Sequence, residues 1–204
     1  MSSMIQNPEA YFRQFVPARD ELLLELENEA RREEIPIVGP VVGELLYVLA
    51  QAAQAKRILE LGTATGYSAI YFARACAAHQ GRVVSLEIDR DMADRALANI
   101  QKAGLEHLVE IRVGDALKEI AALQGTFDLI FLDIEKADYI RALPHCGRLL
   151  RKGGLLVADN TGFKDADDFN RAIMNHPQWR AVHLLALLPL HSPEHDGLCL
   201  ALRI

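Results

Sequence analysis

The stretch from Arg57 to Ser68 constrains the fold of this chain more than any other. It begins with a short apolar run, Ile58–Leu61, which has the length of a buried strand and leads directly into a turn that contains Gly62 and Gly66. Glycine suits a tight turn at which the backbone approaches a ligand closely. An apolar helical pattern follows the turn, and the free N–H groups of that helix would point into it. The sequence therefore predicts a strand, a ligand-binding turn and a helix.

The spacing of the glycines narrows the choice of ligand. A dinucleotide-binding turn carries G-x-G-x-x-G, but Ala64 occupies the position of the second glycine. The Gly-Lys-Ser or Gly-Lys-Thr ending of a P-loop is also missing from this stretch. The pattern Glu60-x-Gly62-x-x-x-Gly66 resembles instead the first motif of S-adenosylmethionine (SAM)-dependent methyltransferases. A plain strand-to-helix turn in another α/β protein is the alternative that this motif alone leaves open.

Predicted strands and helices alternate from Arg57 onward. This alternation implies a doubly wound, mostly parallel sheet with helices on both faces. The last two apolar runs, Trp179–Leu190 and Gly197–Ile204, are joined by a short loop, so they should form an antiparallel hairpin. We therefore expect an α/β, Rossmann-like fold with a seven-stranded sheet. The other predicted strands are 58–61, 82–88, 109–113, 127–132 and 155–158, and the predicted helices between and after them are 68–78, 91–102, 116–123, 136–150 and 165–176.

The residues before this core carry helical patterns. Residues 8–34 read as helical, with Asp20 as a plausible N-cap, and Pro36 and Pro40 are expected to break that helix before a second one at about 42–53. At 204 residues the chain has room for a single domain, with N-terminal helices over 1–54 and the core over 55–204.

The apolar side chains of the first segment exceed what one short helix can hide. We expect them to pack over the site or in a homodimer contact; they include Tyr11, Phe12, Phe15 and Leu22.

Composition excludes several classes of function. The formal net charge is −6 and no dense run of Lys and Arg occurs, so the electrostatic footprint of a nucleic-acid-binding protein is missing. No apolar run approaches the roughly 20 residues that cross a bilayer, and the N-terminus has no signal-peptide core. Cys76, Cys146 and Cys199 lie far apart without a C-x-x-C pattern. We expect reduced, structural thiols in a cytoplasmic protein with no nucleic-acid or membrane partner.

Acidic residues follow several predicted strands, where ligands bind in open α/β sheets. Glu87 comes 21 residues after Gly66, a distance that suits a carboxylate binding two ribose hydroxyls. Asp89 fits the N-cap of the next helix better, which leaves Glu87 free for a ligand. Asp115 follows the third strand, where a contact with an adenine amino group and an N-cap of the helix from Ala116 are equally good interpretations.

Three oxygen donors follow the fourth and fifth strands. Asp133 ends one strand, and Asp159 and Asn160 end its expected neighbour. Carboxylate and amide oxygens suit Mg²⁺, Mn²⁺ or Ca²⁺ and not a thiol-seeking metal. Each acid by itself is more often a helix cap than a ligand, but the three together beside a cofactor turn favour a metal site.

Together these residues resemble the cation-dependent O-methyltransferases of the catechol and caffeoyl-CoA type, from about Val38 to Asn160 and more loosely to the end. The resemblance implies a class I SAM methyltransferase fold, with SAM and Mg²⁺, Mn²⁺ or Ca²⁺ as cofactors. It implies that Lys136 is the base that acts on the acceptor hydroxyl and that Asp133 is catalytic. The implied metal ligands are Asp133, Asp159 and Asn160. The implied SAM-binding residues are Val38, Glu60, Gly62, Thr63, Ser68, Glu87, Asp115, Ala116 and Asp133.

Such a residue set fits methyl transfer to a phenol. The reaction is an in-line displacement, and a neutral phenol is a poor nucleophile. A dication that chelates two adjacent oxygens lowers the pKa of the attacking hydroxyl. Lysine is unfavourable at a helix N-terminus, which weakens the interpretation of Lys136 as an ordinary helix start. The sequence thus predicts an O-methyltransferase for a small aromatic acceptor, with vicinal hydroxyls.

The chain also departs from this family pattern. Only Thr161–Lys164 separates Asn160 from the next helix, so we expect a more open site than a plant-type acyl-CoA acceptor needs, and Ile134 replaces an aromatic residue near adenine. His191 and His195 have a spacing that zinc ligands can have, but a Pro-containing loop without a third ligand disfavours zinc.

Two other functions stay open at this stage. The first is a metal-independent SAM methyltransferase for another nucleophile, in which Asp133 and Asp159 serve as caps or orienting groups. The second is a nucleotide-binding oxidoreductase or a non-catalytic binding module on the same layered fold. The lack of G-x-G-x-x-G argues against the oxidoreductase.

Overall fold

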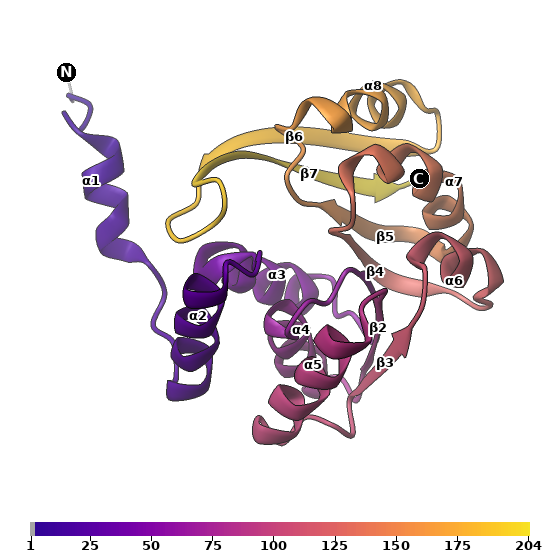
Figure 1. Cartoon of the computed structure of the whole chain (residues 1–204). Helices are drawn as coiled ribbons and strands as arrows, with labels where there is room; N and C mark the ends of the chain where they lie inside the picture. Colours follow the sequence, from indigo (N-terminus) through magenta and orange to yellow (C-terminus); the bar gives the residue numbers. More distant parts are fainter. Residues whose placement is uncertain (1–2) are drawn as a thin grey trace.

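The computed structural model describes residues 3–204, and within them the strands form one seven-stranded sheet (Figure 1). The strands are β1 (Arg57–Leu61), β2 (Arg82–Glu87), β3 (Val109–Val113), β4 (Phe127–Leu132), β5 (Leu150–Ala158), β6 (Trp179–Leu187) and β7 (His195–Arg203). Their order across the sheet is β3-β2-β1-β4-β5-β7-β6. Strands β1 to β5 pair in parallel, whereas β7 is antiparallel to both β5 and β6. The predicted mostly parallel sheet with an antiparallel C-terminal hairpin is confirmed.

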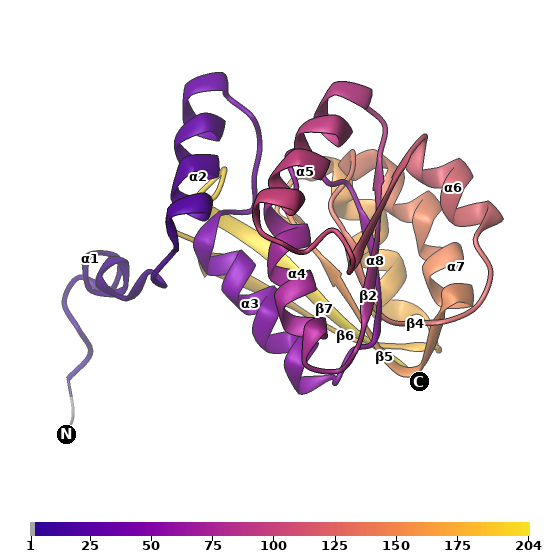
Figure 2. The same cartoon turned by 90° about the horizontal axis from the view of Figure 1, so that it is seen from below.

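Most of the helices form two layers, with the sheet between them (Figure 2). They are α1 (Pro8–Phe12), α2 (Glu21–Glu33), α3 (Gly39–Ala52), α4 (Tyr67–Ala77), α5 (Arg90–Lys102), α6 (Ala116–Ala122), α7 (Tyr139–Leu149) and α8 (Asp167–Asn175), with 3₁₀ turns η1 (Arg13–Phe15), η2 (Lys136–Asp138) and η3 (Lys164–Ala166). Helices α3, α4 and α5 cover one face, and α6, α7 and α8 cover the other. Helix α2 packs outside α3 and α4.

Strand β1 lies at the centre of the core and belongs to both layers. The side chain of Ile58 packs into the cluster beneath α3 and α4, while Leu59 and Leu61 pack into the cluster beneath α6 and α7. All three are fully buried, which explains why this strand reads as an unbroken apolar run. Burial of each such side chain is worth about 1.5–3 kcal/mol, so β1 fixes firmly the turn that follows it.

The strand order reverses at β1, and this switch point brings two distant segments together. Leu61, the last residue of β1, is the register partner of Leu132 at the end of β4. The next residues, Gly62 and Asp133, therefore leave the sheet side by side. In open α/β sheets a crevice for ligands forms beyond the carboxyl ends of the strands at such a point.

The N-terminal helices differ from the prediction. The helical pattern over 8–34 forms two helices: α1 ends at Phe12, and α2 begins after the predicted N-cap Asp20, whose Oδ1 accepts a hydrogen bond from Leu23 N at 3.0 Å. Pro40 does not break a helix but lies in the first turn of α3, where its missing N–H costs no hydrogen bond. Helix α3 consequently begins at Gly39 and not at residue 42.

Several strand boundaries were also predicted wrongly, and β7 for example begins at His195 and not at Gly197. Strand β5 begins at Leu150, because the segment with Gly153 pairs irregularly with the start of β4 across a register shift and does not form a helix-to-strand loop. Strand β6 ends at Leu187, and residues 188–194 form the connection to β7, which we call the β6–β7 loop. Helix periodicity and β-propensity give no signal for a bulge or for an ordered loop, since both depend on tertiary contacts.

Helix α1 lies apart from the body of the molecule (Figure 1). The rings of Tyr11, Phe12 and Phe15 pack on one another and keep 38%, 56% and 59% of their surface exposed. An ion pair between Arg13 and Glu194 connects this segment to the β6–β7 loop. None of the helices in residues 3–204 is long and apolar enough to cross a membrane.

Candidate functional site

A cavity of about 580 Å³ lies beyond the carboxyl ends of β1, β2, β4 and β5. The segment before α3 and the β6–β7 loop complete its walls. Its lining includes almost every residue that the sequence singled out. The predicted site residues that line it are Val38, Gly62, Thr63, Ser68, Glu87, Asp115, Ala116, Asp133, Lys136, Asp159 and Asn160.

Gly62 is the point of closest approach between the two halves of the cavity. Its φ of 92° lies in the region that favours glycine, and a Cβ built there would be 2.0 Å from the carbonyl oxygen of Asp133. The backbone N–H of Asp133 donates to Leu61 O at 2.9 Å. Any side chain at position 62 would therefore push the ends of β1 and β4 apart.

Glu60 lies beneath the cavity as the only predicted site residue that is not part of its lining. Its carboxylate is fully buried; Oε2 accepts hydrogen bonds from Ser85 and, at 3.4 Å, from Thr63 Oγ1. Within residues 3–204, its Oε1 has no hydrogen-bond partner. Burial raises the pKa of Glu60 to about 7, against the hydrogen bonds from Ser85 and Thr63, and the charge of Asp133 adds to the shift. A buried acceptor of this kind fits a ligand that brings an N–H donor or a positive charge.

Glu87 was predicted to be free for a ligand, because Asp89 is the better N-cap, but in the structure its carboxylate is already hydrogen-bonded. Its Oε2 accepts hydrogen bonds from the backbone N–H groups of Thr63 at 3.1 Å and Ala64 at 2.8 Å, and its Oε1 accepts one from Asp89 N at 2.9 Å. The sequence could not reveal this, because the contact joins the end of β2 to the turn after β1. Glu87 thereby holds the glycine turn while it still borders the cavity.

The two interpretations of Asp115 are compatible. Its Oδ1 caps α6 by accepting from Leu117 N at 2.9 Å and from Lys118 N at 3.3 Å. The same residue lines the cavity together with Ala116. Asp89 caps α5, as predicted, through hydrogen bonds from the backbone of residues 91 and 92.

The acid pair lies at the ends of β4 and β5, which are neighbours in the sheet. Partial burial raises the pKa of Asp133 to about 6, and the charge of Asp159 raises it further, while the ammonium of Lys136 opposes the shift. Lys136 Nζ is 3.1 Å from Asp133 Oδ1. Two carboxylates that repel each other in this way form a site where a cation is stabilised.

The residues after β5 are held by side chains from the far end of the chain. Asp159 Oδ1 accepts from the backbone N–H of Asn160 at 2.8 Å, and Asn160 Nδ2 donates to Asp196 Oδ2 at 2.6 Å. Asn160 has a φ of 49°, a conformation that needs such support in a residue other than glycine. With its amide nitrogen engaged by Asp196, Asn160 has its amide oxygen left to offer as a ligand.

The two histidines considered for zinc have separate partners. His191 is buried, with Nε2 2.9 Å from Asp159 Oδ2 and Nδ1 2.7 Å from the carbonyl oxygen of Pro193. His195 is exposed, and its Nε2 lies 3.2 Å from Glu9 Oε1. Burial is the largest single effect and lowers the pKa of His191, but the hydrogen bond to Asp159, the charge of Asp159, the hydrogen bond to Pro193 and the charge of Asp196 together raise it above its usual value. Both partners are acceptors, so both ring nitrogens donate.

The donor set determines which metals could bind here. In the part of the chain that the structure describes, no three His, Cys, Asp or Glu side chains are grouped to hold a metal ion. The predicted set has only two carboxylates, completed by an amide oxygen. Such an all-oxygen set fits a hard dication that keeps some of its water, and it does not fit zinc.

Sequence reasoning missed several residues of the lining, among them Tyr67, Ile88, Met92 and Ser192. Ile88 carried a signal, since it is an apolar side chain directly after Glu87 and is 72% exposed. Tyr67 follows Gly66, and its hydroxyl donates to Glu27 Oε1 at 2.7 Å, which ties α2 to the cavity wall. The position of His191 beside Asp159 had no signal, because 31 residues separate it from Asn160 along the chain.

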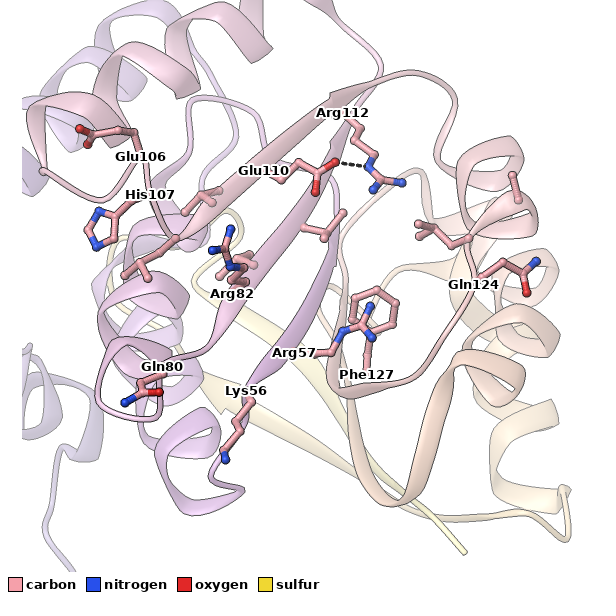
Figure 3. A pocket seen from close by; sticks show the side chains of 16 residues that line it. Lys56, Arg57, Gln80, Arg82, Glu106, His107, Glu110, Arg112, Gln124 and Phe127 are labelled. Carbon is pink, nitrogen blue, oxygen red and sulfur yellow. Dashed lines mark hydrogen bonds and ion pairs between the residues drawn. The ribbon is translucent and has the colours of Figure 1, made fainter.

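A second hollow, of about 700 Å³, lies at the amino ends of β1, β2 and β3 (Figure 3). Its polar side chains are mostly exposed: Arg82 is on the surface, and Arg112 pairs with Glu110 at 2.7 Å. The guanidinium of Arg57 lies 5.0 Å from the centre of the Phe127 ring. None of the predicted site residues borders this hollow. Its size alone therefore does not make it the functional site.

Comparison with known proteins agrees with this geometry. The O-methyltransferase family profile matches residues 16–179. A catechol O-methyltransferase from Niastella koreensis is 39% identical over a 218-residue alignment that covers 98% of each chain. A catechol O-methyltransferase from Mycobacterium tuberculosis is 44% identical over 119 residues, 58% of this chain and 54% of the relative.

Solved structures of similar proteins contain the expected ligand. The O-methyltransferase from Bacillus cereus in complex with SAH has a TM-score of 0.86 at 28% identity, with 97% of each chain covered. The O-methyltransferase TomG from Streptomyces achromogenes in complex with SAM has a TM-score of 0.85 at 30% identity, with 98% of this chain and 99% of that chain covered. The chain thus belongs to the O-methyltransferase family and is a SAM-dependent enzyme of Rossmann-like fold.

Proposed function

We propose that this enzyme transfers the methyl group of SAM to one of two adjacent hydroxyls of a small aromatic acceptor, assisted by a divalent cation. The observation that carries the proposal is the pair Asp133 and Asp159, which lies beside the glycine turn and in which the pKa of Asp133 is raised to about 6. The relatives named catechol O-methyltransferase and caffeoyl-CoA O-methyltransferase support the same acceptor chemistry. The proposed cation ligands are Asp133, Asp159 and Asn160.

The cavity is proposed to bind SAM along the ends of β1, β2 and β3. The Oε1 of Glu60, which has no hydrogen-bond partner within residues 3–204, suits the amino group of the methionine part. Glu87, whose carboxylate borders the cavity, suits the ribose hydroxyls. Asp115 is assigned to the adenine amino group, in addition to its role as a cap. The proposed contacts of the methionine part are Val38, Glu60, Gly62, Thr63, Ser68 and Asp133, and those of the nucleoside are Glu87, Asp115 and Ala116.

Lys136 is proposed as the base that takes the proton from the acceptor hydroxyl. Its Nζ lies 3.1 Å from Asp133 Oδ1, on the wall of the cavity next to the acid pair, and the neutral amine is the form that would accept the proton. The bound dication would supply the charge that favours the ionised hydroxyl. The chain's own contribution is to keep Lys136 beside the hydroxyl and to hold the acceptor in line with the sulfonium methyl.

The test compares catechol with guaiacol, which has one free hydroxyl, in the presence of Mg²⁺ and of EDTA. We expect methylation of catechol that is lost in EDTA and restored by Mg²⁺ or Mn²⁺, and much slower methylation of guaiacol. Activity that persists undiminished in EDTA would favour the metal-independent methyltransferase instead. An acceptor panel should also include an acyl-CoA ester, which the short segment Thr161–Lys164 is expected to disfavour.

We also propose that the exposed aromatic side chains near the N-terminus contact a second copy of the chain. Phe12 and Phe15 border a hollow of about 470 Å³ whose other walls include Val48 and Leu187. Light scattering after gel filtration is expected to give a dimer for the full chain and a monomer for the double variant Phe12→Glu/Phe15→Glu. Met174→Glu, a change at an exposed apolar residue on α8, is the matched control and should leave the dimer intact. A wild-type monomer would contradict this part.

A further inference from the structure

We propose that His191 is a positioning residue: it holds the carboxylate of Asp159 in the orientation in which that group can bind a cation. The inference rests on the proposed function, since it assigns Asp159 to the cation site. It concerns a residue on the β6–β7 loop, beyond residues 16–179 that the family profile matches.

Both ends of the interaction are fixed. The His191 side chain is 2% exposed, and its two ring nitrogens are held by Asp159 Oδ2 at 2.9 Å and by Pro193 O at 2.7 Å. A ring held at both nitrogens cannot rotate without losing a buried hydrogen bond. Asp159 is held at both oxygens as well, because Oδ1 accepts from Asn160 N at 2.8 Å. The carboxylate therefore has one favoured rotamer.

The loop that carries His191 is itself ordered by its own hydrogen bonds. Leu188 N donates to Glu194 O at 2.6 Å, and His191 N donates to Leu188 O at 3.0 Å. Leu190 N donates to Glu194 Oε1 at 2.9 Å, and the same carboxylate pairs with Arg13. The loop also packs on the start of α3, where a Cβ on Gly39 would be 2.7 Å from Leu190 O. These contacts fix the loop backbone that carries His191.

The β6–β7 loop and the start of β7 also contact Asn160, the second proposed cation ligand after β5. Asn160 Nδ2 is 3.4 Å from Ser192 O and donates to Asp196 Oδ2 at 2.6 Å. Asp133, in contrast, is bonded by Lys136 on its own segment. The half of the acid site that β5 contributes is thus oriented by the loop and the start of β7, while the β4 half is oriented locally.

This geometry predicts a specific effect on cation affinity. Groups that orient a metal-binding carboxylate typically change metal affinity about 10–100-fold when they are removed. His191→Phe keeps the size of the ring but removes the donor to Asp159. The variant should bind Mn²⁺ about 10–100-fold more weakly. Its affinity for SAM should stay within about 2-fold, since the ring nitrogens of His191 bond to Asp159 and Pro193 and to none of the proposed SAM-binding residues.

The experiment measures Mn²⁺ binding to the full chain by electron paramagnetic resonance and SAM binding by calorimetry. His191→Gln places its amide nitrogen near the position of Nε2 and should restore most of the Mn²⁺ affinity. His191→Asn stays polar but is too short to reach Asp159, so it should also bind Mn²⁺ about 10–100-fold more weakly. This second variant keeps the test possible if His191→Phe fails to fold. His195→Phe, in the same region but paired with exposed Glu9, is the matched control and should bind Mn²⁺ like the wild type.

The outcomes separate this inference from the proposed function. If the wild type binds Mn²⁺ and both His191→Phe and His191→Asn bind it equally well, the positioning role is wrong while the cation site stands. Parallel loss of Mn²⁺ and SAM affinity without recovery in His191→Gln would mean that the residue only supports the fold, and it would also overturn the role. Absence of Mn²⁺ binding in the wild type would overturn the proposed cation site and this inference with it.

Discussion

The two ends of the parallel sheet form hollows of similar size but of different character. The hollow at the amino ends measures about 700 Å³ and is bordered by exposed cations such as Lys56 and Arg82. The cavity at the carboxyl ends measures about 580 Å³ and lies beside buried and half-buried acids: within residues 3–204 Glu60 has an oxygen without a hydrogen-bond partner, and Asp133 has a raised pKa. A functional site in this fold is therefore distinguished by polar groups held away from water, and not by volume.

The cause of the difference is the direction of the strands. Parallel strands place all their carboxyl ends at one edge, where the connections to the following helices carry short polar segments. The switch between β1 and β4 opens a crevice at this edge. At the other edge, the loops that lead from the helices back to the strands carry long, solvent-exposed side chains. Four predictions test how far the contrast extends, beginning with the largest expected effect.

Removal of a charge from the acid pair should affect catalysis most. Asp133→Asn keeps the shape of the side chain but removes half of the negative charge and weakens the hold on Lys136. We expect kcat/KM for catechol to fall at least about 1000-fold, which corresponds to roughly 4 kcal/mol of transition-state stabilisation. Steady-state kinetics at saturating Mg²⁺ measures the effect. A decrease of less than about 10-fold would show that the pair is not part of the chemistry.

Alanine substitutions at two glycines with positive φ compare how tightly the backbone is packed in the two regions. Gly62→Ala introduces a Cβ only 2.0 Å from a backbone oxygen, whereas Gly104→Ala, before β3, places its Cβ in open space. Left-handed strain alone costs about 1–2 kcal/mol, and the clash at position 62 adds to it. Chemical denaturation should give a loss of about 4 kcal/mol for Gly62→Ala, together with lost SAM binding, and about 1 kcal/mol for Gly104→Ala. Equal losses would contradict the close contact at the switch point.

The raised pKa of Glu60 predicts how stability depends on pH. Its ordinary value is 4.5 and burial raises it to about 7, so the folded, ligand-free protein binds the proton more tightly than the unfolded chain. Stability from this group is complete below about pH 4.5 and is lost as the pH rises through about 7, by roughly 3 kcal/mol. Urea unfolding from pH 4.5 to 8 measures it, and Glu60→Gln should flatten the curve. A wild-type stability that rises over this range would count against the shift.

Changes at the amino ends should have the smallest effect. Arg82→Ala and Lys56→Ala remove exposed cations from the hollow of Figure 3, so each should change stability by no more than about 0.5 kcal/mol. Both SAM affinity and kcat should stay within about 2-fold of the wild type. A clear loss of SAM affinity or activity in either variant would show that the two edges are functionally connected, and the contrast between them would have to be revised.

Local sequence signals determined much of the core architecture. The apolar run before Gly62, the alternation of strands and helices, and the caps Asp20 and Asp89 each depend on neighbouring residues, so each could be predicted and each is found. The seven-stranded sheet with its antiparallel hairpin follows from the same periodicity and from loop length. The boundaries of α3 and β5 could not be predicted, because a proline in a first turn and a bulged strand give no distinct local pattern.

The tertiary structure alone decided how the site is held together. The sequence by itself indicated that acids follow successive strands. It could not show that Glu87 binds the turn after β1, or that Oε1 of Glu60 lacks a hydrogen-bond partner among the residues that the structure describes. The contact between His191 and Asp159 joins the β6–β7 loop to the end of β5, and no periodicity spans that distance. Propensity and capping act over a few residues, whereas these contacts arise only when the folded sheet brings remote segments within hydrogen-bonding distance.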